Sequence, residues 1–182
     1  MAIAYKTCAP VGDLTYTCDP CAVPEMGMVR SLCLIKEGVT VAVPLNLGAF
    51  TSSVEAGDII VIPETRGSFD GGTPRMIPAY GDLTERKAGD DYVLLIKDPN
   101  YADNADFWEE VERHTWNLAF RSETQLHYVD ASVQIMTKAP VEEDLNSQVV
   151  WNAEARWFSK TKPVITPVAP IATLLKCFEI TD

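Results

Sequence analysis

The clearest pattern of hydrophobic and polar positions lies between residues 148 and 158, in the segment QVVWNAEARWF. Every second position on one side is apolar, at Val149, Trp151, Ala153, Ala155 and Trp157. The positions between them are mostly polar and include the charged pair Glu154 and Arg156. Successive side chains of a β-strand point to opposite faces, so this alternation predicts a long, half-buried antiparallel strand.

Shorter runs of apolar and strand-favouring residues predict the other strands of a sheet. They cover residues 28–36, 58–62, 91–97 and 115–121, and then 125–130 and 132–138, which form either one bent strand or two. A last apolar run at 171–180 predicts a short terminal strand. The sequence therefore predicts seven or eight strands.

One principal helix is predicted at about residues 102–113, where aromatic and aliphatic side chains form a compact stripe on an acidic segment. Residues 49–56 predict one or two further helical turns, with Thr51 or Ser52 as the N-cap. Residues 64–82 contain four glycines and two prolines. Such a stretch predicts a loop or a protruding hairpin that contacts something outside the domain.

The two ends of the chain differ from the middle in composition. Prolines and glycines interrupt residues 1–27, so this segment is predicted to be an irregular arm that contains cysteines. Residues 161–182 are predicted to begin as an extended, proline-rich crossing. Between them, residues 28–160 form one domain. The predicted fold class is α+β and mainly β, an antiparallel barrel or sandwich with one flanking helix.

Composition changes this picture mainly through charge. The 182 residues carry a net charge of −11, which disfavours generic binding to nucleic acid because phosphates are neutralised by clustered Lys and Arg. Six acids and no Lys or Arg lie between Asp98 and Glu112. They are either a solvated surface or part of a surface that repels DNA, such as the lining of a conduit. No apolar run is long enough for a membrane helix, and the N-terminus lacks a secretory pattern, so we expect a protein made in a reducing cytoplasm.

Four cysteines provide the main candidate metal site. Cys8, Cys18, Cys21 and Cys33 lie within 26 residues of one another, and four thiolates can enclose a structural zinc ion. The alternative is that they are free cysteines, because Cys33 falls in the middle of a predicted strand, where a thiol packs as a small apolar group. A disulfide would require oxidising surroundings.

Catalytic motifs are absent from the sequence. The only two histidines, His114 and His127, have no serine elbow or HExxH pattern near them. Asp103, Asp106 and Glu110 share a helical spacing that suits a divalent cation, but a solvated helix face explains the same spacing. We therefore predict that the protein is not an enzyme and has no cofactor apart from the candidate zinc.

The order of the predicted elements resembles the tail-tube-type domain of tailed bacteriophages. It is similar, more narrowly, to tail-barrel or ring structural proteins of phages that infect gut Bacteroidetes, including the crAss-like group. The resemblance is carried by four segments, PEMGMVRSLCLIK (24–36), GDIIVIPETRGSFDGG (57–72), DPNYADNADFW (98–108) and DLNSQVVWNAEARW (144–157).

This resemblance implies a non-enzymatic subunit of the virion, assembled in the host cytoplasm. Six or twelve copies would form a ring or tube in the tail or neck, beside other tail proteins and without a membrane. DNA would be only a passing cargo in an acidic lumen. The alternative function is a small zinc-stabilised module that uses its N-terminal cysteines to bind a protein partner. A third alternative is an enzyme with an unrecognised set of catalytic residues.

Overall fold

The structure is a computed structural model of the chain. It describes residues 27–41, 45–63, 65–78, 80–81, 84–141, 148–172 and 174–175. The predicted N-terminal arm, apart from Gly27, and most of the predicted terminal strand at 171–180 lie outside the described residues.

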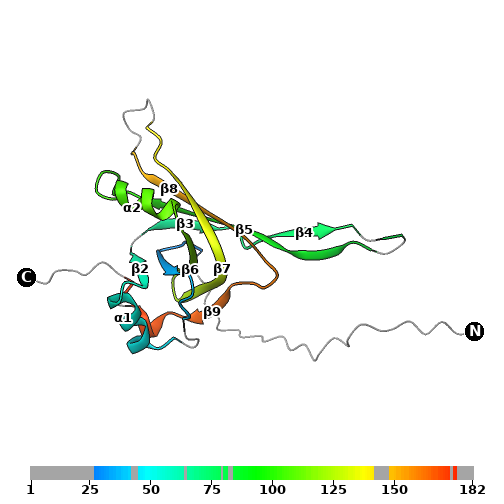
Figure 1. Cartoon of the computed structure of the whole chain (residues 1–182), viewed down its shortest axis with the longest axis horizontal. Helices are drawn as coiled ribbons and strands as arrows, with labels where there is room; N and C mark the ends of the chain where they lie inside the picture. Colours follow the sequence, from blue (N-terminus) through cyan, green and yellow to red (C-terminus); the bar gives the residue numbers. More distant parts are fainter. Residues whose placement is uncertain are drawn as a thin grey trace, which may run out of the picture.

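In the described residues, nine antiparallel strands form one sheet, and two α-helices and a 3-10 turn accompany it (Figure 1). The strands are β1 (Ser31–Lys36), β2 (Ile59–Ile62), β3 (Arg66–Phe69), β4 (Thr73–Ile77), β5 (Arg86–Asp98), β6 (Thr115–Arg121), β7 (Gln125–Lys138), β8 (Trp151–Ser159) and β9 (Val164–Pro167). The helices are α1 (Leu47–Glu55) and α2 (Ala105–Glu112), and the 3-10 turn is η1 (Ala169–Ile171). The prediction of a mainly β, antiparallel fold is confirmed.

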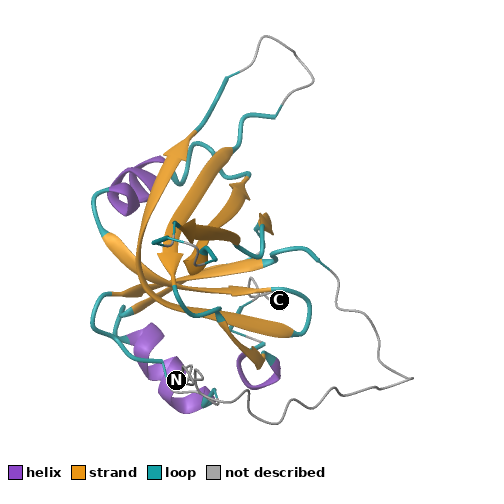
Figure 2. Cartoon of the chain, turned by 90° about the vertical axis from the view of Figure 1, so that its right-hand side faces the viewer, coloured by secondary structure: helices purple, strands orange, loops and turns teal. Residues whose placement is uncertain are grey.

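The strand order is β2-β1-β6-β7-β8-β5-β3, while β4 pairs with β5 and β9 pairs with β7. Figure 2 shows that this sheet is strongly curved. A single bridge joins Val29, just before β1, to Gly67 in β3, through two hydrogen bonds of 3.1 Å. Because this bridge is isolated, the sheet is not closed. Of the predicted barrel or sandwich, the barrel is therefore not shown.

Gly67 allows β3 and β5 to approach each other closely next to that bridge. A Cβ atom at this position would lie 2.4 Å from the backbone oxygen of Leu95 in β5. Real Cβ atoms do not come so near to a backbone oxygen, so only glycine fits between the bridge and β5.

The predicted tryptophan-rich strand is confirmed as β8, which lies between β5 and β7. Ala155 pairs with Leu94 on one side and with Ile135 on the other. Ala153, Ala155 and Trp157 are buried, whereas the next residue, Phe158, is exposed on the opposite face. The alternation in the sequence thus correctly identified the buried face of the strand.

Two clusters of buried side chains form the core on the two faces of β1. Leu32 and Leu34 belong to a first core cluster that also contains Trp157 and residues of α2. Cys33 and Ile35 belong to a second core cluster with residues of α1 and η1. This strand is buried on both faces, which explains its nearly continuous apolar sequence.

Helix α1 begins earlier than predicted. Its N-cap is Asn46, whose side-chain oxygen accepts a hydrogen bond of 3.2 Å from the backbone nitrogen of Ala49. The predicted caps, Thr51 and Ser52, lie inside the helix and donate their hydroxyl protons to carbonyls one turn earlier. An amide side chain therefore satisfies the first turn instead of a hydroxyl.

Helix α2 is shorter than the predicted 102–113, because residues 101–104 form a turn before it. The buried carboxylate of Asp98 organises this turn. It accepts hydrogen bonds from the backbone of Asn100, from Asn104 Nδ2 at 2.6 Å and from Trp108 Nε1 at 2.8 Å. The end of β5 is thereby fixed to the start of α2.

Three further elements differ from, or refine, the prediction. Residues 125–138 form one continuous strand, β7, so the alternative with two strands is wrong. The proline-rich crossing contains a strand, β9, which pairs with residues 125–128 of β7. Ile171, where a terminal strand was predicted to begin, is a buried residue of η1. The prolines were compatible with strand β9 because it lies at an edge of the sheet.

Candidate functional site

The most prominent surface feature is a two-stranded projection formed by β4 and the beginning of β5. From here on, "the arm" means the described residues of this projection between 73 and 89, and not the predicted N-terminal arm. It extends away from the body of the molecule (Figure 1). Residues Arg86–Gly89 pair with β4 only, since β8 begins to pair with β5 at Asp90. The predicted protruding hairpin at 64–82 is therefore confirmed for β4, whereas residues 66–69 form strand β3 of the sheet.

Apolar side chains on the arm are open to solvent. All five residues of β4 are exposed, including Met76 at 48% and Ile77 at 49%, and Tyr80 beyond them is 93% exposed. A two-stranded ribbon alone is only marginally stable in water. Both observations favour a surface that is covered by a partner.

Polar contacts hold the base of the arm. Arg75 donates to Asp91 at 2.8 Å and lies over the ring of Phe158, 4.7 Å from its centroid. Lys87 forms an ion pair of 2.6 Å with the buried Asp90. These contacts join both strands of the arm to the body, so we infer that the arm has a defined direction.

Tyr92 marks the point where the arm meets the first core cluster. Its ring is buried, and its hydroxyl donates to Asp90 at 3.4 Å. Burial raises the pKa of Tyr92 above its ordinary value, and the negative charge of Asp90 raises it further. The phenol is therefore neutral at physiological pH and can act as the donor to this carboxylate.

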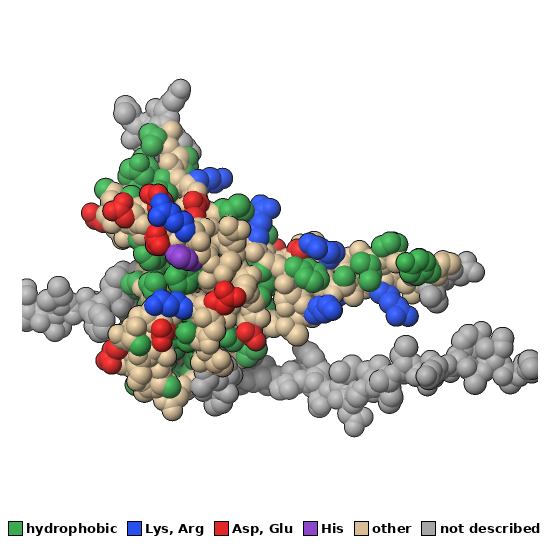
Figure 3. Space-filling view, in the orientation of Figure 1, with side chains coloured by type: hydrophobic (Ala, Val, Ile, Leu, Met, Phe, Trp, Pro, Cys, Tyr) green, Lys and Arg blue, Asp and Glu red, His purple; other side chains and the backbone are tan. Residues whose placement is uncertain are grey.

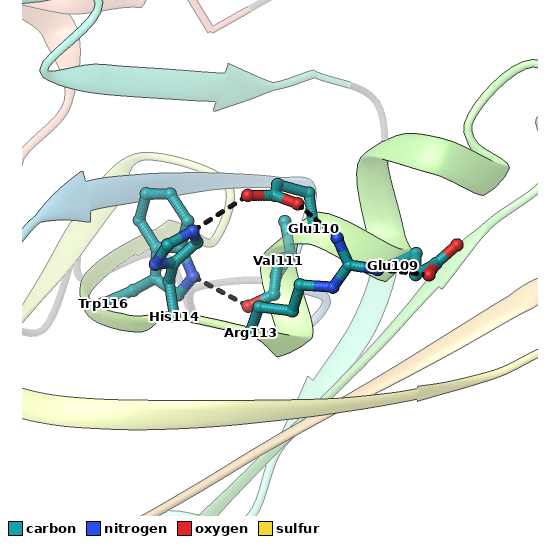
Figure 4. Close-up of polar contacts among 6 residues, drawn as sticks. All are labelled: Glu109, Glu110, Val111, Arg113, His114 and Trp116. Carbon is teal, nitrogen blue, oxygen red and sulfur yellow. Dashed lines mark hydrogen bonds and ion pairs between the residues drawn. The ribbon is translucent and has the colours of Figure 1, made fainter.

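The second surface feature is an acidic face on α2 and the turn before it, which we call the acidic face. It comprises Asp103, Asp106, Glu109 and Glu110. Glu112 is half-buried and instead accepts a hydrogen bond from the backbone nitrogen of Thr137 in β7. Arg113 pairs with Glu109 and Glu110, and His114 Nε2 lies 2.9 Å from Glu110 (Figure 4). Hydrogen bonding to His114 and, secondarily, the charge of Arg113 lower the pKa of Glu110. Asp103 and Asp106 form no ion pair within the described part of the chain.

The divalent-cation site considered as an alternative for Asp103, Asp106 and Glu110 is not formed in the described part of the chain. Asp103 precedes the helix, and Glu110 is occupied by His114 and Arg113. Within the described ranges, no group of three His, Cys, Asp or Glu side chains is arranged to hold a metal ion. The acidic residues thus contribute charge to a surface and do not form a cage.

Of the four candidate zinc ligands, Cys8, Cys18 and Cys21 lie outside the described residues. Cys33 is a buried, free cysteine in the second core cluster. Burial raises the pKa of its thiol to about 12. In this position the thiol packs as a small apolar group. The zinc site of the four cysteines stays a prediction.

This environment predicts the reactivity of Cys33 in the folded protein. We expect Cys33 to remain unmodified during treatment with a thiol-alkylating reagent at pH 8, because the thiol is buried and protonated. Peptide mass spectrometry would measure modification at this position, and the same treatment in denaturant is the control. Rapid alkylation of Cys33 without denaturant would contradict its place in the core.

A surface that the sequence analysis missed is a groove of about 590 Å³ across the outer side of β5, β8 and β7. Its lining includes the exposed side chains of Leu95 and Met136, and also Lys97 and Lys138, two residues further along the same strands. In the sequence, the one indication of this groove was that Leu95 and Met136 are apolar at strand positions where the alternation predicts polar residues.

His127, the second histidine, stacks on Phe120 with ring centroids 4.8 Å apart. Within the described residues, no helix is both long and apolar enough to cross a membrane.

Comparisons of the chain with protein-family models, with curated proteins and with solved structures gave no match.

Proposed function

We propose that this protein is a structural subunit of a phage virion that assembles into a ring or tube in the tail or neck. It acts by binding its neighbours and performs no catalysis. The single observation that supports this most strongly is the arm, a two-stranded ribbon with exposed Met76, Ile77 and Tyr80. Such a ribbon gains stability when a second protein covers it.

The sheet also suits lateral assembly. The outer edges of β4 and β9 have no pairing strand within the described residues, and Val164 and Ile165 of β9 are exposed. An unpaired edge can accept a strand from a neighbouring molecule. In the tail-tube-like arrangement that we propose, the open edges of each curved sheet contact the sheets of neighbouring copies. Together these sheets would form the continuous wall of a tube.

Charge supports a role in which DNA passes without being bound. The chain carries 26 acidic residues against 15 Lys and Arg. A surface of this sign repels phosphates, and a conduit for DNA needs such a surface. We propose that six or twelve copies surround the passage, beside other tail proteins of the virion.

The alternative of a zinc-stabilised binding module receives less support. It relied on four neighbouring cysteines, and Cys33 lies in the second core cluster, away from the surface. The three other cysteines keep the metal prediction open, and bound zinc would be compatible with a ring subunit as well.

Electron microscopy of the purified chain in negative stain tests this proposal. We expect annular particles of uniform diameter with a central opening. Compact particles of the size of one chain, at every protein concentration at which images can be recorded, would contradict it.

A further inference from the structure

A row of basic side chains crosses the outer face of the sheet, the face opposite the first core cluster. Arg66 in β3 pairs with Lys97 in β5. Lys97 also pairs with Asn152 in β8, which pairs in turn with Lys138 in β7. All three basic residues are exposed, and Ile96 beside Lys97 belongs to the first core cluster, so the row points away from that core. We call Arg66, Lys97 and Lys138 the basic row.

The basic row carries charge that the described residues do not neutralise. Like charges directly opposite each other destabilise paired strands, and Arg66 faces Lys97 in this way. None of the three cations forms an ion pair within the described ranges, and Glu154 on the same face of β8 is paired with Arg156. Figure 3 shows that acidic side chains gather over α2 while basic ones are spread more widely. The surroundings of the basic row are therefore positive, although the whole chain carries a net charge of −11.

Two exposed apolar side chains lie beside the basic row. Leu95 and Met136 are 45% and 51% exposed, and each precedes a lysine of the row by two residues, on the same face of its strand. Both line the groove of about 590 Å³, together with Lys97 and Lys138. Nucleic acid is bound mainly through its phosphates and would leave these apolar side chains uncovered. A protein segment that presents carboxylates beside apolar side chains matches both features.

The spacing of the basic row suits an α-helix that lies across the strands. Neighbouring strands are about 4.8 Å apart, so Lys97 is one strand spacing from Arg66, and Lys138 is three spacings, or roughly 14 Å, from it. A helix rises about 1.5 Å per residue, so acidic residues at positions i, i+3 and i+10 have nearly the same separations along its axis. With its side chains a helix is about 10 Å wide, which is enough to cover the adjacent apolar pair.

We propose that the basic row and the adjoining groove bind an acidic, amphipathic helix of another protein. Its carboxylates pair with the three cations of the basic row, and its apolar side chains cover Leu95 and Met136. The apolar contacts supply buried area, and the charges supply orientation and choice of partner. This inference goes beyond the proposed function, because contact with a different protein does not require a ring.

Binding of a designed peptide tests the proposal. The probe is a fluorescent peptide of about 16 residues in which Glu and Leu form adjacent stripes of a helix. It is titrated with the full chain at physiological ionic strength and followed by fluorescence anisotropy, and saturable binding is expected. Lys97→Glu combined with Lys138→Glu is expected to raise the dissociation constant at least about tenfold, because attraction becomes repulsion. Lys160→Glu combined with Lys162→Glu makes the same change of charge at exposed positions after β8, and is expected to stay within about twofold of the wild type.

Two further probes separate the sources of binding. A peptide with Ser in place of Leu is expected to bind at least about fivefold more weakly, because it cannot cover Leu95 and Met136. A DNA duplex is not expected to bind. Equal affinity for the Ser peptide, wild-type affinity of the Lys97 and Lys138 variant for the probe, or binding of DNA that this variant abolishes would overturn the proposal.

Acids outside the described residues require a separate control. The sequence places Glu64, Glu142, Glu143 and Asp144 within a few residues of the basic row. Exchange of all four for their amides is expected to leave the affinity for the probe within about threefold of the wild type. A gain of tenfold or more would show that these acids already occupy the basic row, and would overturn the proposal. Circular dichroism verifies that each variant is folded, and none of these outcomes decides whether the chain assembles into a ring.

Discussion

Replacement of Trp157 by alanine is expected to lower the free energy of unfolding by roughly 3–5 kcal/mol, which is typical for truncation of a large aromatic residue in a core. The ring is 6% exposed and stacks on Tyr92 and Phe69, with centroid distances of 5.2 Å and 5.9 Å. These three rings join β8, β5 and β3, so the cavity would open where three strands pack together. Equilibrium denaturation in urea would measure the loss.

Phe158→Ala is the control for this substitution. Phe158 is the next residue on β8 and lies on the opposite face, where it is 40% exposed beneath Arg75. Loss of one exposed cation–π contact and of some packing is expected to cost only about 1 kcal/mol. Equal losses for the two variants would show that the assignment of the two faces of β8 is wrong.

Asp98→Ala has the second-largest expected effect, a loss of about 3 kcal/mol of stability. Asp98 is 3% exposed and accepts hydrogen bonds from Asn104 Nδ2 and from the buried Trp108 Nε1. Removal of the carboxylate would leave the buried indole N–H without an acceptor, and an unsatisfied buried donor costs about 1–3 kcal/mol. It would also remove the charge-assisted contact that fixes the turn before α2.

Two variants identify the cause of that loss in thermal or chemical denaturation. Asp98→Asn keeps an oxygen acceptor, so we expect about half of the destabilisation. Asp106→Ala removes an exposed carboxylate from the same region and is expected to change stability by less than about 0.5 kcal/mol. If Asp98→Ala were as mild as Asp106→Ala, the hydrogen-bonded turn would not hold β5 to α2.

The strands were predictable where one face is buried and the other is exposed. Apolar residues alternate with polar ones from Trp151 to Trp157, and β8 buries Ala153, Ala155 and Trp157 on the predicted side. The long apolar runs in β1 and β5 were likewise sufficient to predict these two strands from the sequence. Local chemistry was less informative for α1, because an asparagine or a hydroxyl residue can cap a helix and only the structure selects Asn46.

The features that position the candidate functional surfaces depend on contacts between distant segments. Strand β9 lies in a proline-rich segment, and its pairing with β7 spans about 40 residues of sequence, which no local pattern records. The isolated bridge between Val29 and Gly67 is equally non-local. The separation of the arm from the acidic face follows from this topology, so the sequence could indicate the acidic run at 98–112 and the protruding segment at 64–82 without placing them at opposite ends.

Native mass spectrometry of the purified chain would show whether the protein assembles with itself. We expect one closed oligomer of defined size, with six or twelve copies. A monomer at every protein concentration and ionic strength would contradict self-assembly.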